Sequence, residues 1–140
     1  TNHAVNNGKI TVFGGDQMRP NIHINDMVDL YLHLLSLPAE KIDGGIYNAG
    51  YENLAVIKIA ELVKETLSMD IEIEVTPTDD NRSYHVSSEL MKRELGFIPK
   101  YTVEDAVRDL QRAFSQGLIP ESMDKSIYFN IRRMQEVDLT

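Results

Sequence analysis

The chain of 140 residues contains no cysteine and no tryptophan, and its 14 basic side chains are outnumbered by 22 acidic ones. The absence of cysteine excludes disulfides, thiolate nucleophiles and Cys-ligated zinc. It is also compatible with the cytoplasm, where we expect the protein to reside. The net charge of −8 argues against sequence-independent binding to nucleic acid or to an anionic membrane, because both need a basic face. It leaves room for an anionic small ligand held by one or two well-placed arginines.

Long apolar runs are missing as well. Every apolar run is shorter than ten residues, so nothing in the sequence is expected to span a bilayer, and no signal peptide is visible. The apolar share of 42% and the mean hydropathy of −0.28 are typical of a soluble globular protein rather than a disordered one. Since a single domain usually takes about 100–150 residues, the length fits one domain.

The common motifs of cofactor binding and catalysis are also absent. The sequence has no G-x-G-x-x-G after a strand, no phosphate-binding G-x-x-x-x-G-K-[ST], no H-E-x-x-H, no G-x-S-x-G and no Tyr-x-x-x-Lys. Gly14-Gly15-Asp16 follows a predicted strand but lacks a third glycine and a following helix, so we interpret it as a turn. The histidines lie ten or more residues apart, and we expect no metal site. The chain therefore carries no complete catalytic set.

Hydrophobic periodicity predicts an α/β fold, a small mixed domain of about four helices and five short strands. An apolar stripe from Met27 to Leu35 predicts a helix that is capped by Asn25 or Asp26 and ends before Pro38, and we expect this stripe to lie in the core. Further helices are predicted at about 55–67, 88–95 and 103–114. The predicted strands are 9–13, 21–24, 46–49, 71–76 and 83–86. These elements do not form a regular β-α-β series, which suggests part of a larger domain.

Three segments together resemble the C-terminal, substrate-binding part of NAD-dependent sugar-nucleotide epimerases and dehydratases, the extended short-chain dehydrogenase/reductase family. Residues 10–26 resemble that family's v-f-G-x-G-x-x-x-R-D-f-i-H-V-x-D stretch, 46–50 its y-N-x-G, and 80–107 its D-x-R-x-Y, e-L-G-f-x-P and t-x-e-x-a-v series. Order and spacing match over about residues 8–118. Two departures stand out: Pro20 and Asn21 replace the family's Asp and aromatic residue, and Leu90 replaces its Lys.

The resemblance implies a division of labour. In this family the dinucleotide fold, the glycine-rich loop and the catalytic Tyr-x-x-x-Lys belong to an N-terminal NAD-binding domain, which is absent from this chain. Residues 1–120 are then expected to be the sugar-nucleotide-binding segment that completes a Rossmann-type epimerase fold. The parent enzyme would transfer a hydride at the sugar C4 with NAD, whereas the chain alone would be inactive. Residues 121–140 would be a C-terminal tail that docks on another surface through Ile127-Tyr128-Phe129.

Two arginines are the first candidate site residues. An Arg fork matches phosphate oxygens in a bidentate way, and Arg19 stands between a glycine turn and a strand in an acidic chain. By resemblance Arg19 contacts the nucleotide phosphates, and Arg82 provides a second phosphate or ribose contact. The alternatives are local ion pairs, for Arg19 with Asp16 or Asp26, and for Arg82 with Asp79-Asp80.

The resemblance adds three further candidates. Asn48 ends a predicted strand and is placed near the diphosphate, or it merely forms a turn. Val12 and Phe13 lie where the family binds the base, although an ordinary core position is the stronger interpretation for the Phe13 ring. His23 and Asp26 belong to the family motif but look structural: we expect a buried, hydrogen-bonded His23 and a helix-capping Asp26.

Two other interpretations remain open at this point. The chain could be a free-standing, non-catalytic module that binds nucleotide sugars or a partner protein, which predicts a sealed apolar exterior. It could also be a structural fragment with an unfinished sheet, which predicts exposed strand edges and self-association. The segment 46–49 is the candidate edge. The partners expected overall are a nucleotide sugar and the missing N-terminal domain, with no nucleic acid and no membrane.

Overall fold

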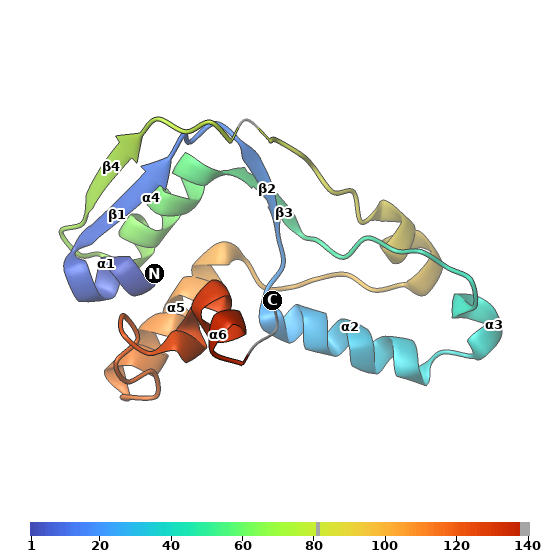
Figure 1. The fold of residues 1–140 in the computed structure, drawn as a ribbon. Helices are drawn as coiled ribbons and strands as arrows, with labels where there is room; N and C mark the ends of the chain where they lie inside the picture. The colour runs from blue at the N-terminus through green and yellow to red at the C-terminus, as the bar shows by residue number, and fades with distance from the viewer. Residues whose placement is uncertain (81, 138–140) are drawn as a thin grey trace.

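The computed structural model describes residues 1–80 and 82–137, in which the strands are interspersed among helices and every element after the last strand is helical (Figure 1). The helical elements are α1 (Asn2–Asn7), α2 (Ile24–Ser36), α3 (Ala39–Ile42), α4 (Val56–Leu67), a π-helical turn (Met91–Leu95), α5 (Val103–Ser115), a 3-10 turn (Ser126–Tyr128) and α6 (Asn130–Glu136). The strands are β1 (Lys9–Phe13), β2 (Met18–Asn21), β3 (Glu52–Ala55) and β4 (Glu72–Thr76). The predicted α/β class is confirmed.

The strands form two separate pairs. β1 and β4 run parallel, from Lys9 opposite Glu72 to Phe13 opposite Thr76. β2 and β3 run antiparallel over 18–21 and 52–55. Parallel strands need a long crossover connection, and the segment between β1 and β4 contains α4, which packs beside β1 (Figure 1).

One core lies under the parallel strands. Its buried members come from α1, α4, α5 and the residue just before β4: Ala4, Val63, Leu67, Ile71 and Val107. A capping box begins α5, because the Thr102 side chain accepts from the Asp105 amide while the Asp105 carboxylate accepts from the Thr102 amide. α1 was not predicted, since four of its six residues are polar and the helix lacks a side-chain cap. Tertiary packing of the fully buried Ala4 stabilises a helix too short to persist alone.

A second core forms around α2 at the other end of the molecule. Leu30 of α2 is buried with Met91, Leu95 and Phe97, and Met27 and Leu34 pack against this group. The apolar stripe of α2 is therefore only partly a core stripe: Tyr31 is 61% exposed and Leu35 is 83% exposed. The reason is that α2 presents a second apolar face, which no described segment covers. None of the helices within 1–80 and 82–137 is long and apolar enough to cross a membrane.

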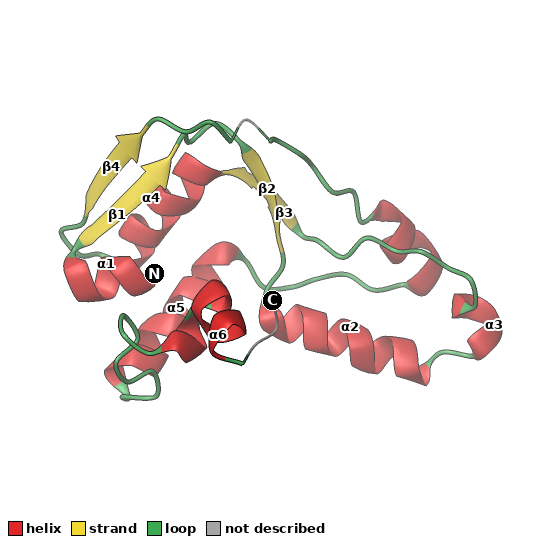
Figure 2. Cartoon of the chain, in the orientation of Figure 1, coloured by secondary structure: helices red, strands yellow, loops and turns green. Residues whose placement is uncertain are grey.

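The two ends are connected by β2, β3 and long loops rather than by a helix (Figure 2). Asp26 strengthens this connection: its carboxylate accepts hydrogen bonds from the backbone amides of Lys100, at 3.0 Å, and Tyr101, at 2.9 Å. The expectation that Asn25 or Asp26 caps α2 is thus wrong. His23 is the cap, because its Nδ1 accepts from the Asn25 amide at 3.1 Å. His23 is buried and hydrogen-bonded, as predicted.

Three strand predictions require correction. Neither 46–49 nor 83–86 is a strand, and the segment predicted at 21–24 pairs earlier, at 18–21. The strand that follows α3 is β3, which begins at Glu52. An extended segment becomes a strand only where a partner backbone pairs with it, and local composition does not identify that partner. The sheet edge expected at 46–49 is therefore not formed.

The C-terminal segment contacts α1 through a serine rather than through its aromatic cluster. Ser122 is buried, and its hydroxyl donates to Asn2 Oδ1 at 2.7 Å while its carbonyl accepts from Asn2 Nδ2 at 3.1 Å. Ile127, by contrast, is 67% exposed. The predicted tail thus contains the 3-10 turn and α6, while 138–140 lie outside the described residues.

Candidate functional site

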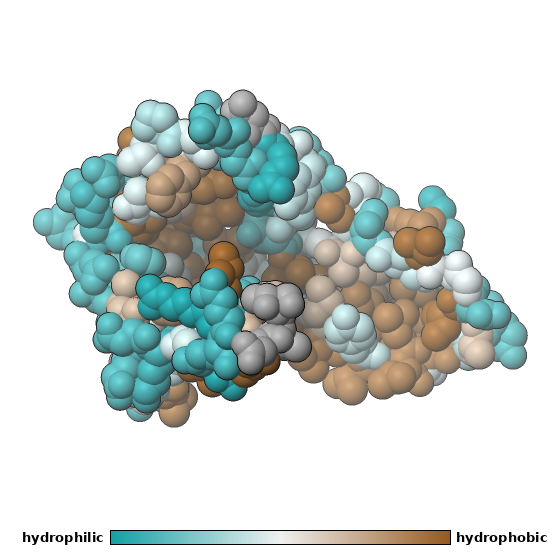
Figure 3. All heavy atoms as spheres, viewed as in Figure 1, coloured by the Kyte–Doolittle hydropathy of each residue, from teal (hydrophilic) through white to brown (hydrophobic). Residues whose placement is uncertain are grey.

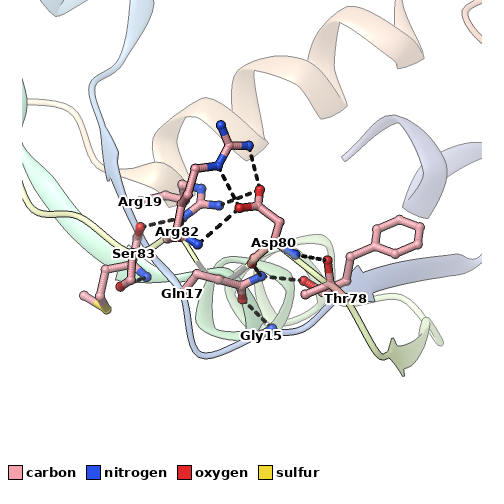
Figure 4. A network of polar contacts seen from close by, with 9 residues as sticks. Gly15, Gln17, Arg19, Thr78, Asp80, Arg82 and Ser83 are labelled. Atoms are coloured by element: carbon pink, nitrogen blue, oxygen red, sulfur yellow. Dashed lines mark hydrogen bonds and ion pairs between the residues drawn. The ribbon is translucent and has the colours of Figure 1, made fainter.

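The structure brings Arg19 and Arg82 together, although they lie 63 positions apart (Figure 4). Arg19 lies on β2, where its Nη1 donates to the carbonyl of Arg82 at 2.6 Å and to the carbonyl of Met18 at 2.9 Å. Its guanidinium carbon lies 5.3 Å from the centroid of the Tyr84 ring, within cation–π distance. Only 26% of the Arg19 side chain is exposed, so this cation is held in a defined position.

Asp80 lies between the two guanidinium groups. Arg82 donates from Nε and Nη2 to its two carboxylate oxygens at 2.7 and 2.8 Å, and Arg19 Nη2 lies 3.7 Å from Oδ2. These hydrogen bonds, with the nearby positive charges, hold the pKa of Asp80 well below its usual range. The local ion pair considered for Arg82 is present. The one considered for Arg19 is wrong in its partner, which is Asp80 rather than Asp16 or Asp26.

A cleft of about 330 Å³ adjoins this cluster, lined by Gly14, Gly15, Asp16, Gln17, Thr78, Asp80 and Ser83. Its floor is the glycine turn, which folds back because the Gln17 amide donates to the Phe13 carbonyl at 2.8 Å. Gly14 has a φ of +79°, and a Cβ there would lie 2.7 Å from the Thr78 methyl group. Only glycine fits this close approach, so the turn shapes the cleft.

The other predicted site residues lie in different surroundings. Val12 is buried in β1, whereas Phe13 is 62% exposed. The interpretation of the Phe13 ring as ordinary core is therefore wrong, because β1 ends there and the ring points out of the sheet's packed face. Asn48 is exposed in the irregular segment between α3 and β3. None of the hydrogen bonds found within 1–80 and 82–137 joins Asn48 to the arginine pair.

A second cavity, of about 440 Å³, lies beside the segment 85–89 and includes Tyr51, Asn53, Ser88 and Lys92 in its lining. The Asn53 amide is used for structure, since it both donates to and accepts from the Val86 backbone. Neither arginine is part of the lining of this cavity or of the cleft at Asp80. The cleft nevertheless includes Asp80, whose carboxylate pairs with both arginines, so it is the cavity that adjoins the two cations.

The sequence did not identify every member of the arginine cluster. Tyr84 was noted only as part of a motif, and Asp80 only as a local partner of Arg82. The sequence indicated a contact of Asp80 with Arg82, because the two residues are two positions apart. The contact of Asp80 with Arg19 depends on the fold. Across the described ranges, no three His, Asp or Glu side chains are grouped closely enough to hold a metal ion.

Comparisons with known proteins agree with this picture of the fold. Residues 1–50 match the model of the NAD dependent epimerase/dehydratase family. No curated protein matches the sequence. Among solved structures, L-threonine dehydrogenase from Phytophthora infestans is similar with a TM-score of 0.70 at 12% identity, covering 82% of this chain and 39% of that one.

Two epimerases have slightly lower TM-scores at higher sequence identity. UDP-glucose 4-epimerase from Thermotoga maritima, solved with UDP-glucose, has a TM-score of 0.66 at 23% identity, with 79% of this chain and 36% of that one covered. ADP-L-glycero-D-manno-heptose-6-epimerase from Helicobacter pylori has a TM-score of 0.67 at 20% identity, with 81% and 35% covered. The chain thus spans less than half the length of the structures it matches. The expected fold is confirmed: the chain shares the fold of part of these dehydrogenases and epimerases, and its first 50 residues resemble the epimerase/dehydratase family.

Proposed function

We propose that this chain is the substrate-binding, C-terminal portion of a cytoplasmic NAD-dependent nucleotide-sugar epimerase or dehydratase. The observation that carries the proposal is the pair Arg19 and Arg82 beside a cleft with a glycine-turn floor. Two cations at one position suit a diphosphate, whose oxygens accept bidentate hydrogen bonds from guanidinium groups. In a chain of net charge −8, such a pair is a specific anion site rather than part of a basic surface.

The role of the chain in this proposal is to bind and orient. The arginines hold the diphosphate, the cleft receives the nucleoside, and the sugar is directed toward the rest of the enzyme. The described residues do not fit a dinucleotide cofactor: the turn at Gly14-Gly15 leads into β2 and not into a helix, whereas a dinucleotide site needs a helix N-terminus behind the glycines. NAD binding is therefore assigned to the N-terminal domain of the parent enzyme.

The second apolar face of α2 supports a missing domain. Five side chains at helical spacing share this face and are 48–83% exposed: Ile24, Val28, Tyr31, Leu32 and Leu35. The space-filling view shows apolar residues gathered over this region (Figure 3). Continuous apolar patches on a soluble protein mark interaction surfaces. A free-standing binding module is not expected to expose a large apolar face. The exposed face of α2 therefore favours a chain that packs against another domain.

Titration calorimetry with nucleotides tests the proposed function. We expect UDP or dTDP to bind the chain more tightly than the corresponding monophosphate, and the nucleoside alone to bind weakly, because the arginines recognise the diphosphate. Equal affinity for nucleoside and nucleoside diphosphate would contradict the proposal. The coding sequence upstream of Thr1 gives an independent test: we expect an in-frame glycine-rich strand-turn-helix motif and a Tyr-x-x-x-Lys, and a start codon directly before Thr1 would favour the binding module.

Self-association of the isolated chain is a further expected result. Without its covering domain, the α2 face should pair with a second copy, and Leu35→Asp should convert the chain to a monomer, since a charge there opposes burial. Sedimentation velocity over a range of protein concentrations measures this. Leu118→Asp is the matched control, because Leu118 is 67% exposed but lies beyond α5, away from α2. A wild-type chain that is monomeric at every concentration would show that this face needs no partner.

A further inference from the structure

We propose that Asp80 competes with the ligand for Arg19 and Arg82. Its carboxylate pairs with both guanidinium groups, and the phosphates of the ligand must displace it. This inference rests on the proposed function, since it concerns the same cleft. As a consequence, a ligand must form enough contacts to offset the loss of the ion pairs of Asp80. Simple phosphates, which offer only their charged oxygens, would be held weakly, whereas a nucleotide gains additional contacts in the cleft that offset the displacement.

The contacts of Arg82 show that Asp80 takes the position a phosphate would use. Arg82 presents Nε and Nη2 side by side to the two carboxylate oxygens, at 2.7 and 2.8 Å, which is the bidentate geometry of phosphate recognition. The Arg82 amide adds a third hydrogen bond to Oδ1 at 3.1 Å. The Arg82 side chain is 81% exposed, and an ion pair so accessible to water is weak enough to be exchanged.

Arg19 is positioned to receive a ligand once Asp80 leaves. Its Nη1 is bound to two backbone carbonyls (Figure 4), so its position does not depend on the carboxylate. Nη2 lies 3.7 Å from Asp80, longer than a hydrogen bond. Because Asp80 also lines the cleft, its carboxylate and a bound phosphate would compete for one space between the two cations.

The backbone of Asp80 is held independently of its side chain. Its amide donates to the Thr78 hydroxyl at 3.2 Å, and its carbonyl lies 3.5 Å from the Gln17 amide nitrogen. Replacing the carboxylate therefore leaves these loop contacts in place. This makes Asp80→Asn, which keeps the shape of the side chain and removes only the charge, a clean variant.

The experiment is calorimetric titration of the chain with inorganic pyrophosphate. We expect Asp80→Asn to bind pyrophosphate roughly three- to tenfold more tightly than wild type, because an exposed ion pair no longer has to be broken. Asp79→Asn is the matched control, since Asp79 is an exposed neighbour in the same loop and its replacement removes the same charge. We expect it to change affinity less than twofold. Asp80→Ser, which cannot form the pair, should reproduce the gain, and circular dichroism verifies that each variant is folded.

Three results would overturn the inference: no binding of pyrophosphate by either Asp80 variant, binding no tighter than wild type, or an equal gain in Asp79→Asn. A loss of affinity would mean that Asp80 positions Arg82 instead of competing for it. Titration with UDP separates this inference from the proposed function. A pyrophosphate gain without tighter binding of UDP than of pyrophosphate supports the competitor and contradicts a nucleotide site. Tight UDP binding without a gain in pyrophosphate affinity supports the nucleotide site and contradicts competition by Asp80.

Discussion

Replacement of Arg19 by glutamine is expected to lower the affinity of the chain for a nucleoside diphosphate by roughly tenfold to a hundredfold. Hydrogen bonds to charged groups contribute about 1.5–3 kcal/mol, and Arg19 is the less exposed of the two cations, with 26% of its side chain accessible. Because its backbone contacts and Tyr84 already fix the guanidinium, little conformational entropy is lost when a phosphate binds. Calorimetric titration with UDP or dTDP measures the change.

Arg93→Gln is the matched control for Arg19→Gln. Arg93 is 70% exposed in the π-helical turn and pairs only with its neighbour Glu94 among the described residues, so its replacement removes the same charge away from the cleft. We expect its effect on affinity to stay below twofold. A comparable loss in both variants would mean that the overall charge of the chain, and not the position of Arg19, controls binding. Thermal melts of both variants separate lost binding from lost folding.

Asp26→Ala is expected to lower the free energy of unfolding by about 3 kcal/mol. The Asp26 side chain is fully buried, and its carboxylate accepts from two backbone amides, at Lys100 and Tyr101. Alanine would leave both part-buried amides without this acceptor, at a cost of about 1–3 kcal/mol each when no water replaces it. Urea unfolding at a fixed protein concentration measures the change.

Asp29→Ala, one turn along the same helix, distinguishes this effect from a general loss of charge. Asp29 is 45% exposed, and its contact with Lys100 Nζ is 3.9 Å long, so we expect a change within about 0.5 kcal/mol. Asp26→Asn should fall between the two, because an amide oxygen still accepts one hydrogen bond. Equal stability of Asp26→Ala and Asp29→Ala would show that the 100–101 segment holds its position without Asp26.

Local periodicity predicted the elements whose buried faces are formed by regularly spaced apolar residues. The helices α2, α4 and α5 and the strands β1 and β4 lie close to their predicted positions, because each repeats an apolar pattern over its own length. The predictions that failed depend on distant partners. Residues 46–49 look like a strand but have no pairing segment, and Asp26 looks like a helix cap but bonds to amides 74 and 75 positions away.

The candidate site shows the same difference between features that depend on local sequence and features that depend on distant contacts. Arg19 and Arg82 could be proposed from their types and neighbours, and Asp80 from its proximity to Arg82. The sequence could not predict that one carboxylate lies between both arginines, because β2 and the loop after β4 meet only in the folded chain. Phe13 is a further example: its alternation with Val12 predicts opposite faces, but whether the outer face is covered depends on what else packs there.

The parallel pairing of β1 and β4 has a consequence for the order in which the molecule assembles. Val12 and Thr76, which are joined by a side-chain hydrogen bond, are separated by 64 positions, and β1 leaves the ribosome long before its partner exists. Loop closure over such a distance is entropically costly and slows folding. The helices can form as they emerge, whereas β1 remains without its ladder until α4 and β4 have been synthesised. During translation, the glycine turn that follows β1 therefore gains the hydrogen bond from the Gly14 amide to the Thr76 carbonyl only after β4 has been synthesised.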